Sequence, residues 1–340
     1  MIPNFVKHKV RPQDNLASLA SRLRITEEEL KQFHNQNCGK MEKLWFGNLH
    51  GVEFILIPTF YISKEQQEIR KEKMLPSKEY FPDFHASKYL VSEIFEESYK
   101  ESLNFNYSVN LNIQNSKDGF IAETVVENFT KNGAVHDDKV SSLSLACMNK
   151  IYPISYKLSQ NGRLESCFHH HNLVEQFSKK RPELEDFFIG DISKSYIDFF
   201  VEKLSDENYF FRQMQSGLLY QTLFINLEWF HKKADWRERF FIYSNSFPLE
   251  FSFNAEQNFD DSYFVETKIF GTLSEKCSLR ELLKGIPIED EDFEENIHAE
   301  IHIEYFTNKT TKQLHEVKSS VSIWHQNELF QKHRLHLTQN

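Results

Sequence analysis

Alternation of apolar and polar positions is the clearest pattern in the chain. Over residues 103–113, the sequence LNFNYSVNLNI places Phe105, Tyr107 and Val109 between asparagines and a serine. A period of two over this length predicts a strand with one buried face and one solvated face. An SKDG turn and the apolar segment GFIAETVVENF come next, so the pattern predicts a β-hairpin.

Seven further segments have the composition of strands. The first two are joined by an Asn161–Gly162 turn signal, and the other five lie after residue 236. The segments are KIYPISYKLS, RLESCF, RERFFIYSN, SYFVETKIFGTL, IHAEIHIEYF, KSSVSIWH and LFQKHRLHL. Because strand and helix do not alternate, the order of segments predicts an antiparallel sheet rather than a parallel one.

The middle of this region has a helical period instead. Over residues 169–224, Phe, Leu, Ile and Tyr recur at spacings of three and four. The apolar stretch 196–224 fits either core packing or a partner surface. A capping box of Ser278 and Glu281 predicts one more short helix, which Gly285 ends.

These elements predict an α+β fold for residues 89–340. We expect a large antiparallel sheet, with strands in 89–168 and 239–338, and a helical insertion over 169–224. The segment 61–88 is charged and contains Pro76 and Pro82, which predicts a linker with a helical part over Lys64–Lys73.

Residues 5–60 form a separate small unit. FVKHKV predicts a strand, and Asp14 is placed to cap a helix over Asn15–Leu23. Thr26 and Glu29 form a capping box for a second helix that runs to about His34. The apolar segment GVEFILIP then predicts a closing strand, which gives the order strand, helix, helix, strand.

This unit resembles the LysM family. The matching positions are spread over the whole unit: Val10, Asp14, Leu16, Leu19, Ala20, Leu30, Asn35, Ile57 and Pro58. The resemblance implies a small βααβ domain, and in the family such domains bind N-acetylglucosamine polymers, mainly peptidoglycan or chitin. The sugar lies against two loops, one after the first strand and one before the second.

The resemblance also indicates candidate glycan- or partner-binding residues. They are Gln13, Asp14, Asn15 and Leu16 in the first loop, and Asn35, Trp45 and Phe46 in or beside the second. Gln13 and Asn15 stand where the family has glycine and threonine, and the second loop, 36–50, is longer than the family pattern. Its two aromatic rings could stack on a sugar or pack against the second domain.

The layout of a LysM-like unit joined to a large α+β domain resembles accessory proteins of bacterial contractile injection machines, including type VI secretion systems. That resemblance implies a non-enzymatic adaptor with a secretion-machine protein as partner. The alternatives are a peptidoglycan-binding protein and a cell-wall hydrolase. The first residues lack a signal-peptide pattern and no apolar window of about 18 residues occurs. We therefore expect a cytoplasmic chain without membrane insertion, exported, if at all, by a non-classical injection-machine route.

Composition narrows the function further. The formal net charge of -10 argues against a nucleic-acid partner, because such proteins need a basic face. The 32 phenylalanines and 13 tyrosines, against 10 glycines, predict an aromatic core without a glycine-rich phosphate loop. Four cysteines occur far apart without CxxC pairing, which predicts reduced thiols: Cys38, Cys147, Cys167 and Cys277.

Three clusters have residue types that could bind a metal. They are the run Cys167–His171, the strand positions His298, Glu300, His302 and Glu304, and the acidic run 289–295. Each lacks the remaining ligands or the spacing of a known metal site. We interpret them as a hairpin-to-helix junction, a solvated sheet face and a solvated loop. No Gly-x-Ser-x-Gly motif occurs, so we expect no catalytic residues, no cofactor and no metal.

Overall fold

A computed structural model describes residues 5–46, 48–59, 64–98, 100–117, 119–135, 138–244, 246–287 and 296–340. The chain divides into unit 1, Met1–Lys73, and unit 2, Met74–Asn340. Of the predicted linker 61–88, the part up to Lys73, which includes the helix α3 (Lys64–Glu72), belongs to unit 1. The rest belongs to unit 2, because Leu75, Tyr80 and Phe84 are buried there. Unit 2 thus begins earlier than its alternating pattern indicated.

Unit 1 has the predicted element order. Its strands are β1 (Phe5–Lys9) and β2 (Phe54–Pro58), which pair antiparallel. Between them lie α1 (Leu16–Leu23), α2 (Glu27–Asn37) and the 3-10 turn η1 (Lys40–Glu42). Both helices begin with capping boxes, and that of α2 is the predicted pair Thr26 and Glu29. A small core of leucine and isoleucine side chains from both helices and β2 holds the unit together.

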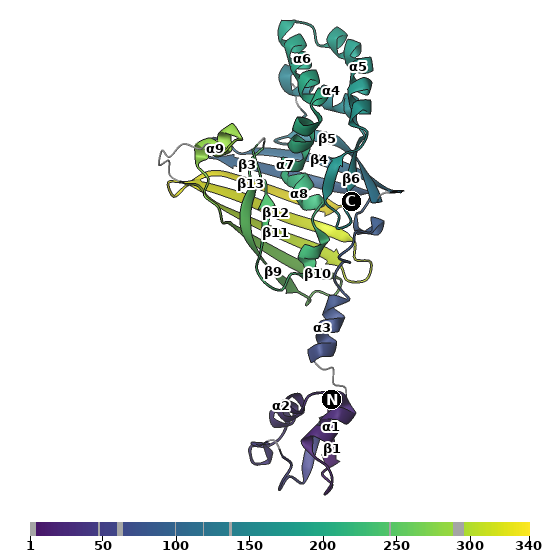
Figure 1. Cartoon of the computed structure of the whole chain (residues 1–340), viewed down its shortest axis with the longest axis vertical. Coiled ribbons are helices and arrows are strands. Elements are labelled where there is room, and N and C mark those ends of the chain that lie inside the picture. The colour runs from purple at the N-terminus through teal and green to yellow at the C-terminus, as the bar shows by residue number, and fades with distance from the viewer. Residues whose placement is uncertain are drawn as a thin grey trace. The chain divides into compact units, whose positions relative to one another are not determined.

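Unit 2 is built on one large antiparallel sheet, which confirms the α+β class. The strands that the described residues form are β3 (Lys88–Glu97), β4 (Leu103–Ser116), β5 (Gly119–Lys131), β6 (Ile154–Leu158), β7 (Leu164–Cys167), β8 (Trp236–Phe240), β9 (Leu249–Asn258), β10 (Phe264–Leu273), β11 (His298–Asn308), β12 (Leu314–His325) and β13 (Glu328–Gln339). Their order is β7-β6-β5-β4-β3-β13-β12-β11-β10-β9-β8. The first and last strands of the unit, β3 and β13, therefore pair at the centre (Figure 1). Strands β7 and β8 are its two edges.

Helices interrupt this sheet at several places. They are η2 (Pro82–Phe84), α4 (Lys139–Ile151), α5 (His170–Phe187), α6 (Asp191–Ser205), α7 (Glu207–Ser216), α8 (Leu218–Leu223), η3 (Leu227–His231) and α9 (Leu279–Lys284). Helices α5 to α8 confirm the predicted insertion, and α9 has the predicted capping box and glycine stop. Helix α4 corrects the prediction, because residues 89–168 were expected to form strands only. Its Leu143, Cys147 and Ile151 lie one turn apart and are buried.

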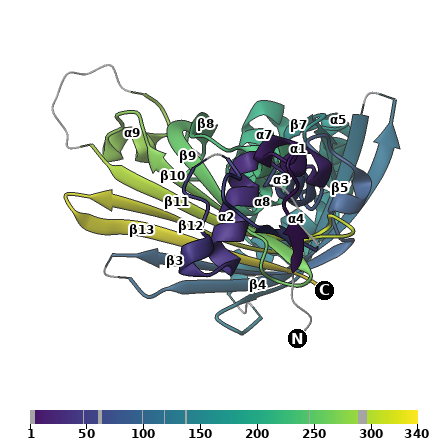
Figure 2. The same ribbon diagram turned by 90° about the horizontal axis from the view of Figure 1, so that it is seen from below.

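The large sheet curls around α8 (Figure 2). Five of the six α8 residues are buried, so this part of the stretch 196–224 packs in the core and is not a partner surface. Two side chains from other parts of unit 2 hydrogen-bond to the carbonyls at the C-terminal end of α8. The Tyr305 hydroxyl donates to Thr222 O at 3.0 Å, and His85 Nε2 donates to Leu223 O at 2.8 Å. The curl brings the sheet edges together, where Arg163 Nη1 lies 3.1 Å from Glu238 Oε1.

Gly271 lies where two strands of the sheet pack closely. It lies in β10 opposite Phe253 of β9. A Cβ at this position would lie 2.4 Å from the Phe253 ring, well inside van der Waals contact. The absence of a side chain at Gly271 thus lets the ring lie over the strand, where it also packs against Trp229 and Trp236.

Candidate functional site

The first loop of unit 1 is organised by Asp14. Its carboxylate accepts hydrogen bonds from His8 Nε2 at 3.0 Å, from the Arg11 amide at 2.9 Å and from Arg22 Nη2 at 3.0 Å. These contacts lower the pKa of Asp14 from 3.8 to about 2, with the His8 hydrogen bond as the largest cause. Asp14 therefore ties β1 to α1 and is not the helix cap that the sequence indicated.

The cap of α1 is the next residue. Asn15 Oδ1 accepts from the Ser18 amide at 2.7 Å, and the Asn15 amide donates to Ser18 Oγ, which completes a capping box. Leu16 is only 3% exposed and belongs to the core. Of the four predicted residues in this loop, only Gln13 is exposed and makes no side-chain hydrogen bond with the described residues, so the loop offers little side-chain chemistry to a ligand.

The base of the second loop is fixed by two residues of α2. The Asn35 side chain makes a reciprocal pair of hydrogen bonds with Leu44: Oδ1 accepts from the Leu44 amide at 2.7 Å and Nδ2 donates to its carbonyl at 3.0 Å. His34 is buried, accepts from the Leu56 amide through Nδ1 and donates to Glu42 O through Nε2. Both ring nitrogens are thus used, and the neutral tautomer joins the loop to β2.

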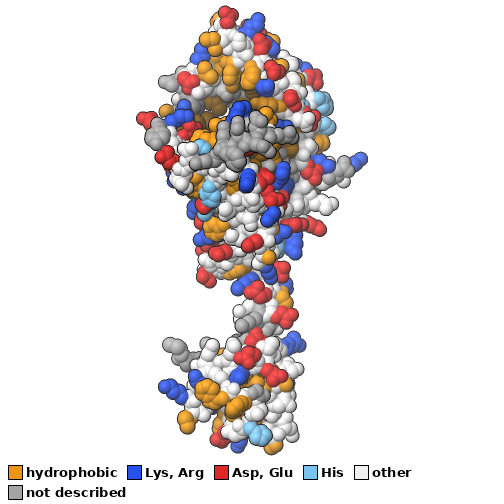
Figure 3. Space-filling model, turned by 60° about the vertical axis from the view of Figure 1, so that its left-hand side comes forward, with side chains coloured by type: hydrophobic (Ala, Val, Ile, Leu, Met, Phe, Trp, Pro, Cys, Tyr) orange, Lys and Arg blue, Asp and Glu red, His pale blue; other side chains and the backbone are white. Residues whose placement is uncertain are grey.

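Directly after this anchor, two aromatic rings lie in solvent. Trp45 is 73% exposed and Phe46 is 76% exposed, and Met41, on the same loop, is 98% exposed. Large apolar side chains gain free energy on burial, so Trp45 and Phe46 leave apolar surface in solvent on a loop that is anchored. Figure 3 shows hydrophobic side chains gathered on the surface of unit 1. We call Trp45 and Phe46, with their anchor Asn35, the aromatic loop.

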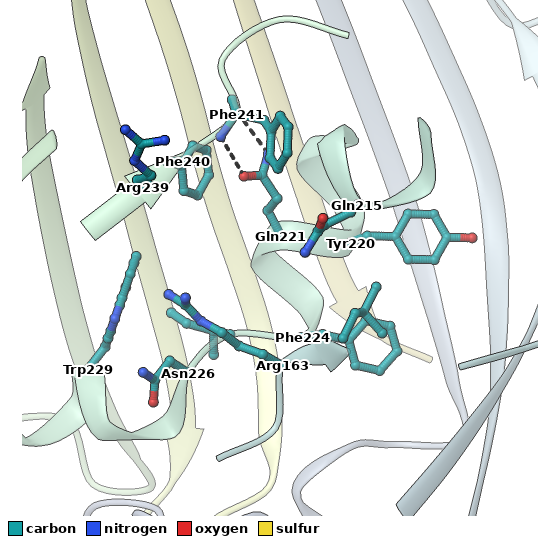
Figure 4. Close-up of a pocket in the computed structure, with 12 residues that line it drawn as sticks. Arg163, Gln215, Tyr220, Gln221, Phe224, Asn226, Trp229, Arg239, Phe240 and Phe241 are labelled. Carbon is teal, nitrogen blue, oxygen red and sulfur yellow. Dashed lines mark hydrogen bonds between the residues drawn. The ribbon is translucent and has the colours of Figure 1, made fainter. Parts of the chain in front are cut away.

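Unit 2 contains a small cavity where the sheet edges meet (Figure 4). Its volume is about 80 Å³ and its polar lining comes from Arg163, Gln215, Gln221, Asn226 and Arg239. Ligand pockets usually have about 300 Å³ or more, whereas a water molecule needs only about 15 Å³. The cavity therefore has room for several waters, not for an organic substrate.

Two polar side chains of this cavity, Gln221 and Arg163, are already engaged. Gln221 exchanges two hydrogen bonds of 2.9 Å with the Phe241 backbone. Arg163 pairs with Glu238 and lies over the Trp229 ring, 5.4 Å from its centroid (Figure 4). These residues come from distant segments that no local motif joins, so the sequence pattern did not indicate them.

The histidine clusters have the structural roles that the sequence indicated. The run Cys167–His171 forms the junction between β7 and α5, where buried His170 donates to Leu204 O at 2.7 Å. On β11, His298 and His302 flank Glu300 on the solvated face, at 3.2 Å and 3.5 Å. The described residues contain no group of three metal-ligating side chains. The acidic run 289–295 lies outside the described residues.

The buried cysteines are poor nucleophiles. Burial raises the pKa of Cys147 to about 11, and that of Cys167 and Cys277 to about 12. Because the thiolate is the reactive form, these three side chains remain protonated thiols near neutral pH. Cys38 is half-buried in unit 1, and burial raises its pKa as well.

In comparisons with known proteins, the chain matches no protein-family model and no curated protein. None of the helices described here is long and apolar enough to cross a membrane.

Proposed function

We propose that the chain is a non-enzymatic adaptor that docks through the aromatic loop of unit 1 and holds a second protein on unit 2. The observation that supports docking is the exposure of Trp45 and Phe46 on a loop that Asn35 fixes to α2. Aromatic side chains are enriched at the centres of protein interfaces. A fixed loop also loses little conformational entropy on binding, which favours affinity.

Several observations support a binding role rather than catalysis. The thiols of Cys147, Cys167 and Cys277 are buried and protonated. His85 is buried with both ring nitrogens hydrogen-bonded, and burial lowers its pKa to about 4. The resemblance in layout to accessory proteins of contractile injection machines supports a secretion-machine protein as the partner.

A second candidate function is binding of a peptidoglycan-type glycan. It is favoured by one observation: the indole of Trp45 is exposed in the loop where the LysM resemblance puts the sugar. The flat apolar face of a sugar ring can cover an indole, and the neighbouring backbone can donate hydrogen bonds. The first loop gives this candidate less support, because Asp14, Asn15 and Leu16 are used within the fold.

Two measurements on the full chain test these proposals. The first is co-sedimentation with insoluble peptidoglycan of the wild type, the Trp45→Ala, Phe46→Ala double variant and a Met41→Ala control. Glycan binding predicts that the wild type and control pellet and that the double variant stays in solution. If none of them pellets, the glycan candidate fails.

The second measurement is photo-crosslinking from a benzoylphenylalanine at position 45 in the native cell, with position 187 of unit 2 as control. The adaptor proposal predicts one protein crosslinked from position 45 and not from position 187, and loss of that product when Asn35 is replaced by alanine. An absence of any position-specific product would contradict docking through the aromatic loop.

A further inference from the structure

A groove of about 750 Å³ lies between β5 and α4 in unit 2. On the strand side it is lined by the consecutive residues 125–129, and on the helix side by Leu145, Met148, Asn149 and Tyr152. Consecutive strand residues point to opposite faces of a sheet, so a groove that touches all five lies along the edge of β5. Helical residues spaced by three, four and seven share one face. A strand edge and one helix face therefore bound the groove.

This edge of β5 lacks a neighbouring strand within the described part of the chain. Strand β4 follows the opposite edge of β5 as far as Lys131, whereas β6 pairs with β5 only over residues 120–124. Beyond Thr124, residues 125–128 thus have a strand on one side only. The groove begins where the shorter strand β6 ends.

The strand register shows which peptide group faces the groove. The Ser155 carbonyl accepts a hydrogen bond from the Phe168 amide at 2.7 Å, so the peptide groups of Ser155 face β7. Those of the next residue, Tyr156, therefore face β5, where Tyr156 lies opposite Ala122. Peptide groups alternate between the two edges of a strand. Ala122 and Thr124 therefore face β6, and the N–H and C=O of Val126 face the groove. No backbone hydrogen bond to Val126 from that side occurs among the described residues.

The chemistry of the groove fits an extended peptide. An unpaired strand edge is a template for another strand, which would hydrogen-bond to Val126 and fill the space between β5 and α4. Its alternate side chains would then contact the half-buried apolar side chains of Val126, Leu145 and Met148. The volume is that of ordinary ligand pockets, and four strand residues span roughly 13 Å. A small apolar molecule would leave the Val126 peptide group without a partner.

A second copy of the chain fits this edge less well than a short peptide. The register of β4 and β5 shifts between Asn106 and Ser108, and Asn128 has a φ of 57°. Such a bulge bends the strand and ends its regular edge after a few residues. A long edge-to-edge pairing between two β5 strands is therefore disfavoured, whereas a short segment needs only residues 125–127.

We propose that the groove between β5 and α4 binds an extended peptide segment of a partner protein by β-strand addition. This inference deepens the proposed function and rests on it, because it identifies the surface of unit 2 that holds the second protein. Its test leaves the aromatic loop of unit 1 unchanged, so the two proposals fail independently.

The test uses the full chain and a fluorescein-labelled peptide of seven residues, in which valine and threonine alternate between terminal lysines. A second probe has the same side chains but carries N-methyl groups on alternate amides, which removes the donors that a strand edge requires. We expect fluorescence anisotropy to show binding of the first probe in the micromolar range and at least tenfold weaker binding of the second. Met148→Arg should weaken binding of the first probe tenfold. Phe187→Arg, a matched change at a 79% exposed side chain, should leave that binding unchanged.

Hydrogen exchange provides a second readout that does not depend on a variant. The bound peptide should slow exchange of the Val126 amide and leave the amides of β9 unchanged. The proposal is overturned if the first probe shows no binding up to 1 mM, or if N-methylation leaves the affinity unchanged. It is also overturned if the chain is a dimer in solution that the Met148→Arg variant converts to a monomer, since a second copy would then occupy the groove.

Discussion

Arg163 Nη1 lies 3.1 Å from Glu238 Oε1, and this ion pair joins the opposite edges of the large sheet. Arg163 directly precedes β7, whereas Glu238 lies in β8, and all the other strands of the sheet lie between them in the ladder order. The guanidinium also lies 5.4 Å from the Trp229 ring centroid. Side chains therefore hold the curl of the sheet at a place where no strand ladder joins β7 to β8.

A double-mutant cycle tests this contact. We expect Glu238→Gln and Arg163→Met each to lower the free energy of unfolding, and Arg163→Met to cost more because it also removes the contact with Trp229. Partly exposed ion pairs contribute about 0.5–1 kcal/mol, and a cation–π contact adds about 1 kcal/mol. Urea unfolding of the wild type and the variants, at low and at high salt, measures these two contributions. A coupling energy of zero between the two sites would show that the pair contributes nothing.

His85 predicts a pH dependence of unit 2. Its Nδ1 accepts from the Tyr80 hydroxyl at 2.8 Å, its Nε2 donates to Leu223 O at 2.8 Å, and burial lowers its pKa from 6.5 to about 4. The unfolded chain therefore binds a proton at higher pH than the folded chain does. Stability is complete above pH 6.5 and falls between pH 6.5 and pH 4, by about 3 kcal/mol over that window.

The matched variant for this prediction is His85→Gln, because an amide keeps one donor and one acceptor but does not titrate. Urea unfolding of both proteins between pH 4 and pH 7 gives the measurement. The wild type should lose more stability than the variant over this range, and the difference should vanish above pH 7. Parallel pH curves for the two proteins would contradict the role of His85.

The sequence predicts most strands of unit 2 because a sheet with one buried face needs an apolar residue at every second position. The same reasoning identifies the outer face of β11, where His298 and His302 alternate with buried Ala299 and Ile301. Strands β3 and β9 and helix α4 were not predicted as segments, although β9 and α4 leave a clear signal. Leu249, Phe251 and Phe253 alternate in β9, and Leu143, Cys147 and Ile151 recur every four residues in α4.

Other features have no local signal. The pairing of Arg163 with Glu238, and of His85 with the end of α8, joins segments that are far apart in the chain. The groove beside β5 exists because β6 is shorter than β5, and strand length is set by packing rather than by pattern. In unit 1 the sequence predicts Trp45 and Phe46 as contact residues, but it does not show that Asp14 is used within the fold.

Asp14 predicts an acid-sensitive contribution to the stability of unit 1. Its folded pKa of about 2 lies below its usual value of 3.8. The stabilisation is therefore complete above about pH 4 and is lost as the pH falls towards 2. Asp14→Asn should destabilise unit 1 at pH 7 and have a much smaller effect at pH 2, where the folded carboxyl is already about half protonated. Hydrogen exchange of peptides from residues 5–58 measures this within the full chain. An equal effect at both pH values would show that the charge is not involved.

Gly271 gives the sharpest packing prediction. A Cβ there would lie 2.4 Å from the Phe253 ring, which itself is fully buried between Trp229 and Trp236. A Cβ at this distance would force the buried ring to shift, so Gly271→Ala should cost about 1–3 kcal/mol, the usual cost of overpacking a core. Phe253→Leu alone should also destabilise unit 2, because it leaves a cavity.

In the Gly271→Ala, Phe253→Leu double variant the added methyl group occupies part of the space that the ring leaves. The double variant should therefore lose less stability than the sum of the two single losses, and urea unfolding of the four proteins gives this coupling energy directly. Strictly additive losses would mean that the ring and the glycine do not compete for the same volume, and the close packing of β9 on β10 would then need another explanation.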